Sequence, residues 1–131
     1  MESQEFSNLM REQHPTLFRP DTELDVAARV GKGWLSLLAE LFGALSEHRL
    51  KGDFWIVQIK EKFGTLRVQV AFEKDDRELR HDVYKLLAQF EARSSTTCER
   101  CGSEQGVLLV QPWERVRCPR CSLFEALEGQ G

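Results

Sequence analysis

The sequence lacks long hydrophobic runs, and no segment approaches the roughly 20 consecutive apolar residues that a membrane-spanning helix needs. It also lacks an excess of positive charge, because 18 lysines and arginines face 21 aspartates and glutamates and leave a formal net charge of −3. With 41% hydrophobic and 30% charged residues, the 131 residues are typical of one soluble globular domain with at most a small metal-binding appendage. These absences argue against a membrane protein and against nucleic-acid binding through overall charge.

Cysteine is scarce, and all four cysteines lie in two C-x2-C pairs separated by sixteen residues. The first pair is Cys98 and Cys101, and the second is Cys118 and Cys121. This spacing predicts a zinc ribbon, in which each pair forms a tight turn that presents two thiolates to one Zn²⁺ ion. Because four thiolates close the coordination sphere, we expect the zinc to hold the fold rather than to catalyse a reaction.

Two other interpretations of the cysteines stay open. Short secreted chains often contain disulfides, but a bond within C-x2-C would close a very small loop. Residues 1–10 also have neither the basic start nor the apolar run of a signal peptide. A redox-active pair is the second alternative, although two pairs at ribbon spacing favour shared ligation of a metal. We therefore predict a cytoplasmic zinc protein.

The C-terminal segment, residues 95–131, is predicted to be this zinc ribbon with a short tail. Residues 107–110 and 113–117 are expected to form a hairpin between the cysteine pairs, and residues 122–127 a short helix. Four arginines face five glutamates, so the segment is not a basic module. Trp113 is expected to cover the small hydrophobic side of the ribbon, and a surface that stacks on nucleic-acid bases is the alternative.

Residues 1–94 predict an α+β domain in which helices pack on a small antiparallel β-hairpin. Helical periodicity or capping residues mark four segments: 3–10, 21–30, 33–48 and 75–93. The candidate N-caps are Ser3, Asp21 or Thr22, and Asp75 or Asp76. A β-rich run at 54–59 and an alternating run at 66–72 flank a turn at 63–65 and indicate the two strands.

The turn of this hairpin carries an unusual set of side chains. In a purely structural interpretation, Phe63 packs the turn onto the core and Gly64 takes a positive φ angle. In a functional interpretation, Lys60, Lys62 and Arg67 form a basic ridge beside Phe63 that grips an acidic protein surface or a phosphate backbone. The two interpretations are compatible, and both stay open.

Part of the sequence resembles a known group of proteins. The string IKEKFGTLR at residues 59–67, a helix some twenty residues later, and TCERCG at 97–102 before a second cysteine pair are the matching features. They resemble small, mostly uncharacterised bacterial and bacteriophage zinc-ribbon proteins with a KEKFGxLRF motif followed by a CExCG knuckle. The resemblance covers residues 54–121, and Val68 replaces the aromatic residue of the motif. It implies no catalytic residue, and some members occur in prophages or near toxin genes.

Catalytic motifs are missing. The sequence contains neither G-x-S-x-G nor H-E-x-x-H, and no cysteine lies outside the two pairs. The three histidines, His14, His48 and His81, fall in separate predicted elements. Gly31-Lys32-Gly33 lacks the rest of a phosphate-binding loop, so we interpret it as the entry to a helix. We therefore predict that the protein is not an enzyme.

Two non-enzymatic functions remain. The first is a protein-binding module, most concretely an immunity protein or inhibitor that binds a bacterial toxin or defence component. The alternative is a nucleic-acid-binding or phage regulatory protein that uses the ribbon, where Arg100, Arg115, Arg117 and Arg120 surround the knuckles. The residues predicted to contact a partner are Lys60, Lys62, Phe63, Arg67, Arg115 and Arg117.

Overall fold

The computed structural model describes residues 3–19 and 30–129, so the predicted helix at 21–30 lies almost entirely outside the described residues. The helices are α1 (Ser3–Gln13), the 3-10 helix η1 (Lys32–Trp34), α2 (Leu35–His48), the 3-10 helix η2 (Arg49–Lys51), α3 (Arg77–Ser94) and α4 (Pro119–Glu128). The strands are β1 (Phe54–Lys62), β2 (Thr65–Phe72), β3 (Val107–Leu109) and β4 (Arg115–Arg117). The predicted α+β class is confirmed, with a β1–β2 sheet and a separate β3–β4 sheet.

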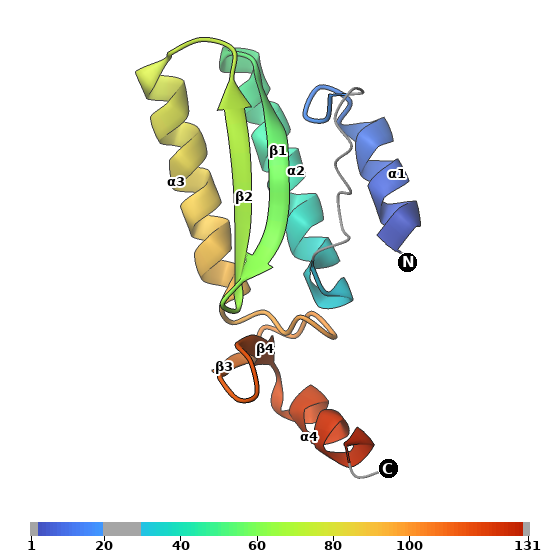
Figure 1. The fold of residues 1–131 in the computed structure, drawn as a ribbon. Coiled ribbons are helices and arrows are strands. Elements are labelled where there is room, and N and C mark those ends of the chain that lie inside the picture. Colours follow the sequence, from blue (N-terminus) through green and yellow to red (C-terminus); the bar gives the residue numbers. More distant parts are fainter. Residues whose placement is uncertain (1–2, 20–29, 130–131) are drawn as a thin grey trace.

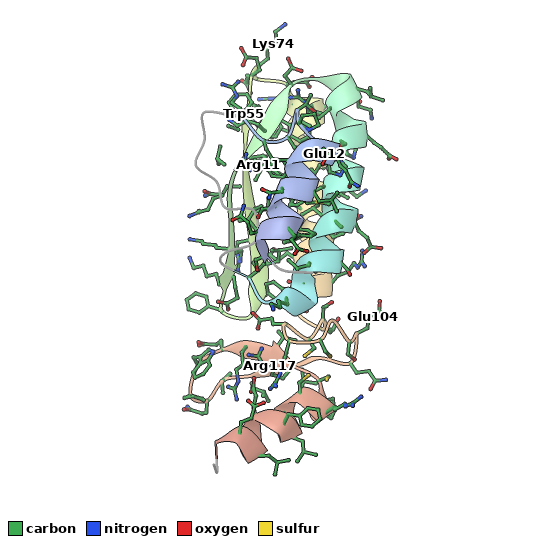
Figure 2. The ribbon with its side chains drawn as sticks, turned by 90° about the vertical axis from the view of Figure 1, so that its right-hand side faces the viewer. Arg11, Glu12, Trp55, Lys74, Glu104 and Arg117 are labelled. Atoms are coloured by element: carbon green, nitrogen blue, oxygen red, sulfur yellow. The ribbon has the colours of Figure 1, made fainter. Side chains whose placement is uncertain are left out.

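The body of the molecule is one layer of helices on one face of the β1–β2 sheet (Figures 1 and 2). The broad apolar stripe of α2 predicts such burial, and Trp34, Leu38, Leu41, Phe42 and Leu45 are fully buried between the helices and the sheet. The segment after α1 is held to β1, because the N–H of Ile56 donates to the carbonyl of Leu17 at 2.9 Å. On β2, the exposed Arg67 and Gln69 point to the other face of the sheet and alternate with Leu66, Val68 and Val70.

The β1–β2 hairpin has a two-residue turn, with Lys62 paired to Thr65 across it. Phe63 and Gly64 have φ angles of 54° and 81°, and a tight hairpin turn of type I′ needs positive φ at both positions. The strands are antiparallel, and their register shifts between Ile56 and Gln58, where β1 contains a bulge. The predicted hairpin is confirmed, although β1 continues three residues beyond the predicted end at residue 59.

Helix α3 begins as its sequence predicts. The Asp76 side chain caps it by accepting a hydrogen bond from the N–H of Leu79 at 3.1 Å. Leu79, Val83 and Phe90 are buried, as expected for residues on one helical stripe. Ser94 ends the helix beside β2, so the predicted domain boundary after residue 94 coincides with the end of α3.

The ribbon lies at one end of the body, near the tip of the β1–β2 hairpin and the start of α2 (Figure 1). Strands β3 and β4 pair antiparallel, as predicted, with Leu108 opposite Val116. Helix α4 begins at Pro119, three residues before the predicted start at residue 122. Within the described ranges, none of the helices has the length and apolar character that crossing a membrane requires.

Candidate metal centre

The four predicted metal ligands come together. The sulfurs of Cys98, Cys101, Cys118 and Cys121 all lie within 4.8 Å of one another, and the Sγ atoms of Cys101 and Cys118 are 3.6 Å apart. A tetrahedral zinc with Zn–S bonds of about 2.3 Å places its sulfurs about 3.8 Å apart. The donor set and its spacing therefore fit a tetrahedral four-thiolate metal site, and such a site leaves no coordination position for a substrate.

The first knuckle is shaped by backbone hydrogen bonds around Cys98. Its N–H donates to the carbonyl of Ser103 at 2.8 Å, and its carbonyl accepts from the N–H of Gly102 at 2.9 Å. Gly102 has a φ of 85°, a conformation that favours glycine. The glycine after the first pair therefore lets the chain turn tightly enough for both of its thiols to face the same point.

The second knuckle is built on the start of a helix. Cys118 is the N-cap of α4, and its sulfur accepts a hydrogen bond from the N–H of Cys121 at 3.4 Å. Pro119 occupies the first turn, where its missing N–H costs nothing. The positive end of the helix dipole favours thiolates at this place, as metal ligation requires.

The surroundings of the four thiols shift the pKa values of Cys98 and Cys121 in opposite directions. Burial would raise the pKa of Cys98, but hydrogen bonds with neighbouring backbone groups outweigh it and lower this pKa to about 7. For Cys121, burial and hydrogen bonds with the other cysteines raise the pKa to about 12. Four negative charges this close together need a cation to balance them, and a divalent metal would stabilise all four thiolates at neutral pH.

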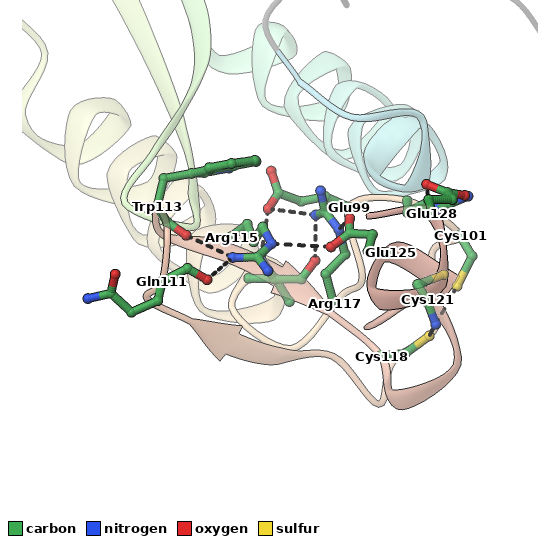
Figure 3. Close-up of polar contacts among 12 residues, drawn as sticks. Glu99, Cys101, Gln111, Trp113, Arg115, Arg117, Cys118, Cys121, Glu125 and Glu128 are labelled. Atoms are coloured by element: carbon green, nitrogen blue, oxygen red, sulfur yellow. Dashed lines mark hydrogen bonds and ion pairs between the residues drawn. The ribbon is translucent and has the colours of Figure 1, made fainter. Parts of the chain in front are cut away.

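A partly buried ion-pair network supports the metal site (Figure 3). Arg117 reaches Glu99 at 3.5 Å and also pairs with Glu125 of α4, and Arg115 reaches Glu125 at 3.3 Å. Burial raises the pKa of Glu99, whose carboxylate also accepts the N–H of Val116 at 2.7 Å. Burial would likewise raise the pKa of Glu125, but the hydrogen bonds from the two arginines outweigh it and lower this pKa. The network ties α4 and the first knuckle to β4.

The ribbon is docked on the body through the Gly31-Lys32-Gly33 segment. The N–H of Gly33 donates to the carbonyl of Glu99 at 2.8 Å, and the indole N–H of Trp34 donates to the carbonyl of Thr97 at 2.8 Å. A Cβ atom on Gly33 would lie 2.2 Å from the carbonyl oxygen of Cys98, so only glycine permits this approach. The segment does lead into α2, as predicted, but its contact with the knuckle was missed. In the sequence, only the two glycines of Gly31-Lys32-Gly33 indicated such a close backbone contact.

The tip of the β1–β2 hairpin does not pack as the structural interpretation predicts. Gly64 does have the predicted positive φ, but the Phe63 side chain is 61% exposed, so the expectation that it packs on the core is wrong. A tight turn directs the side chain at this position outward, and the Val116 and Leu108 side chains of the ribbon meet Gly64 instead. Lys60 and Lys62 make no ion pair with any described residue, whereas Arg67 pairs with Glu91 of α3 at 2.8 Å.

The predicted role of Trp113 is also wrong, because its side chain is 59% exposed. The interior of the ribbon is small enough to be filled by Val116 and the cysteines, and Trp113 lies in the β3–β4 connection outside it. The Arg115 guanidinium lies 5.1 Å from the centre of the indole ring. Two of the predicted partner-binding arginines, Arg115 and Arg117, are held in the ion-pair network.

Comparison with known proteins adds nothing to this geometry. No protein-family model matches the sequence, and no curated protein or solved structure matches it significantly. The resemblance of residues 54–121 to phage and bacterial zinc-ribbon proteins therefore stays a prediction.

Proposed function

We propose that the protein is a non-enzymatic protein-binding module that binds Zn²⁺ in its ribbon and presents the tip of the β1–β2 hairpin to a protein partner. In the most concrete form of the proposal, it is a cytoplasmic immunity protein or inhibitor that binds a bacterial toxin or defence component. Zinc is the metal that the four-thiolate donor set favours, and its role is to hold the ribbon against the body.

The conformation and exposure of Phe63 carry the proposal. A bulky residue with a φ of 54° is uncommon, and Asn or Asp suits this turn position much better. The exposed side chain also gains little from burial in the chain itself. Neither backbone preference nor core packing explains a phenylalanine here, and a residue held against local preference on an exposed tip is typical of a binding site.

The surroundings of the tip fit an interface. Lys60 and Lys62, which pair with no carboxylate among the described residues, lie on the strand that leads to Phe63, and the Lys62 ammonium is 5.6 Å from its ring centre. Leu108 of the ribbon contacts the turn and is itself 51% exposed. An aromatic anchor beside an aliphatic side chain and basic residues is suited to an acidic protein surface.

Nucleic-acid binding is the second candidate, and the exposed indole of Trp113, which lies beside the guanidinium of Arg115, favours it. Against it stand the net charge of −3 and the ion pairs that already engage Arg115 and Arg117. Protein binding therefore has the better support.

The experiment is affinity capture with the tagged, zinc-loaded protein from its native cytoplasm, in parallel with the variant Phe63→Asn. The variant creates an Asn-Gly turn, which suits the backbone better than the native pair, so the hairpin keeps its fold. We expect one stoichiometric protein partner that persists at high salt and is lost, or weakened at least tenfold, with the variant. Zinc is quantified in both eluates as a control for folding.

Two outcomes would contradict the proposal. Capture of the same partner with undiminished affinity by Phe63→Asn would remove the tip from the interface. Recovery of nucleic acid alone, lost as salt is raised and dependent on Trp113, would instead support the second candidate.

A further inference from the structure

A groove runs between β2 and α3 beside the polar face of the sheet. It has a volume of about 700 Å³, and its walls include Val68 and Val70 of β2 and Tyr84, Leu87 and Ala88 of α3. Figure 1 shows α3 running alongside β2 over most of its length. The groove shares Lys60 and Lys62 with the proposed contact at the hairpin tip, but Phe63 does not line it.

The strand at the base of the groove has a free hydrogen-bonding edge. In an antiparallel pair, alternate residues direct their N–H and C=O groups away from the partner strand. Leu66 is such a residue, because its N–H donates to the Ser94 hydroxyl of α3 at 2.8 Å. Val68 and Val70 follow at alternate positions, and β2 pairs with no other strand than β1 within the described residues. Their outward backbone groups are available to another extended chain.

The charge of the groove indicates what kind of chain it accepts. Its lining contains Lys60, Lys62 and Arg67 but one carboxylate, Glu91, which pairs with Arg67. Tyr84 is 50% exposed on the helix side and adds an apolar surface with a hydroxyl group. The groove thus combines backbone donors and acceptors, apolar walls and two lysines that pair with no carboxylate among the described residues. Together these suit an extended segment with acidic side chains.

We propose that this groove binds an extended, acidic segment of a protein partner, which adds to β2 as a third strand of the sheet. The inference rests on the proposed protein-binding function, because the occupant is polypeptide, but it concerns an adjacent surface between β2 and α3 that shares only Lys60 and Lys62 with the tip. The Arg67–Glu91 ion pair and the Leu66–Ser94 hydrogen bond already engage groups toward the hairpin-tip end of β2. The added strand therefore lies along Val68 and Val70.

The test is a titration of the ¹⁵N-labelled, zinc-loaded full chain with a synthetic hexapeptide of alternating glutamate and valine, followed by NMR. We expect saturable shifts of the amide signals of Val68 and Val70. A hexapeptide of alternating lysine and valine should bind at least tenfold more weakly, because it opposes the lysines. The glutamate peptide with alternate nitrogens methylated should also bind at least tenfold more weakly, because it cannot complete the strand ladder.

Matched variants locate the charge contribution. Lys60→Glu should lower the affinity for the glutamate peptide at least fivefold. Lys74→Glu makes an equal charge change at an exposed residue outside the groove lining and should leave this affinity unchanged. The inference is overturned if no saturable shift occurs at millimolar peptide, if the shifts lie away from β2, or if the N-methylated or lysine peptide binds equally well.

Failure of this inference is distinguishable from failure of the proposed function. Phe63→Asn leaves the groove intact and should not change the peptide titration. Suppose that Phe63→Asn no longer captures the protein partner and that the native chain does not bind the glutamate peptide. The tip interface is then retained, and only the groove is rejected. If the glutamate peptide binds but no captured protein depends on Phe63, the groove is retained and the tip interface is rejected.

Discussion

The body and the ribbon of this protein are stabilised in different ways. The body buries one continuous core that includes Trp34, Phe42 and Phe54, whereas the buried cluster of the ribbon consists of three cysteines, beside which Val116 is also buried. A module this small cannot gain enough from hydrophobic burial to fold alone, and a metal held by its four thiols would supply what is missing. The comparison shows that hydrophobic side chains in the ribbon are free to face outward, as Trp113 and Leu108 do.

At each of the contacts described between the two regions, at least one partner is a backbone group. Gly33 and Glu99 join the start of α2 to the first knuckle, and the Trp34 indole reaches the carbonyl of Thr97. On the other side of the junction, Gly64 of the hairpin turn contacts Leu108. Because both contacts depend on the shape of the knuckle and of β3–β4, we expect the metal to control how the ribbon is placed and the core to control whether the body folds.

The largest expected effect comes from removing a metal ligand. Cys118→Ser should abolish stoichiometric zinc binding and unfold the ribbon, since structural zinc contributes about 10–16 kcal/mol in zinc-finger peptides. Amide hydrogen exchange should then lose protection across residues 98–128 while α2 keeps it, and zinc is measured by elemental analysis. Ser122→Ala, which leaves all four thiols in place, is the control. Loss of protection in α2 as well would show that the body depends on the metal.

A smaller effect, confined to the body, is expected from Phe42→Ala. Phe42 is fully buried and its ring lies 5.2 Å from that of Phe18, so its truncation should lower the free energy of unfolding by about 3–5 kcal/mol. Chemical denaturation followed by circular dichroism measures this, and the zinc content of the folded variant should stay unchanged. Leu50→Ala, at a side chain that is 91% exposed, should change stability by less than about 0.5 kcal/mol. If the folded Phe42→Ala variant lost its zinc, the stability of the body and metal binding by the ribbon would not be independent.

The smallest of these effects concerns the junction. Gly33→Ala places a Cβ against the backbone of Cys98 and Gly102, which should cost about 1–3 kcal/mol and increase hydrogen exchange at the junction. Zinc should remain bound, because no ligand is changed. Gly43→Ala is the matched control: nothing lies within 4 Å of its added Cβ in the middle of α2, so it should stabilise by about 0.5–1 kcal/mol. Equal destabilisation by both changes would refute a specific role for Gly33.

Local patterns predicted most of the elements correctly. The cap at Asp76 and the apolar stripe of α3 lie within one helix, and the alternation in β2 lies within one strand, so neighbouring residues were enough to find them. The environments of Phe63 and Trp113 were predicted wrongly, because exposure depends on which distant residues fill the adjacent space. Val116 and the cysteines already fill the interior of the ribbon, and the tight turn directs the Phe63 side chain outward.

The sequence by itself determined the four thiol ligands, the two hairpins and the main helices. Each of these depends on spacings of a few residues, which act through local geometry and hydrogen bonding. Only the tertiary structure decided that Gly33 meets the knuckle, that Glu125 engages Arg115 and Arg117, and that Phe63 points to solvent. These arrangements join residues far apart in the chain, and their energies come from packing and burial that no single segment contains.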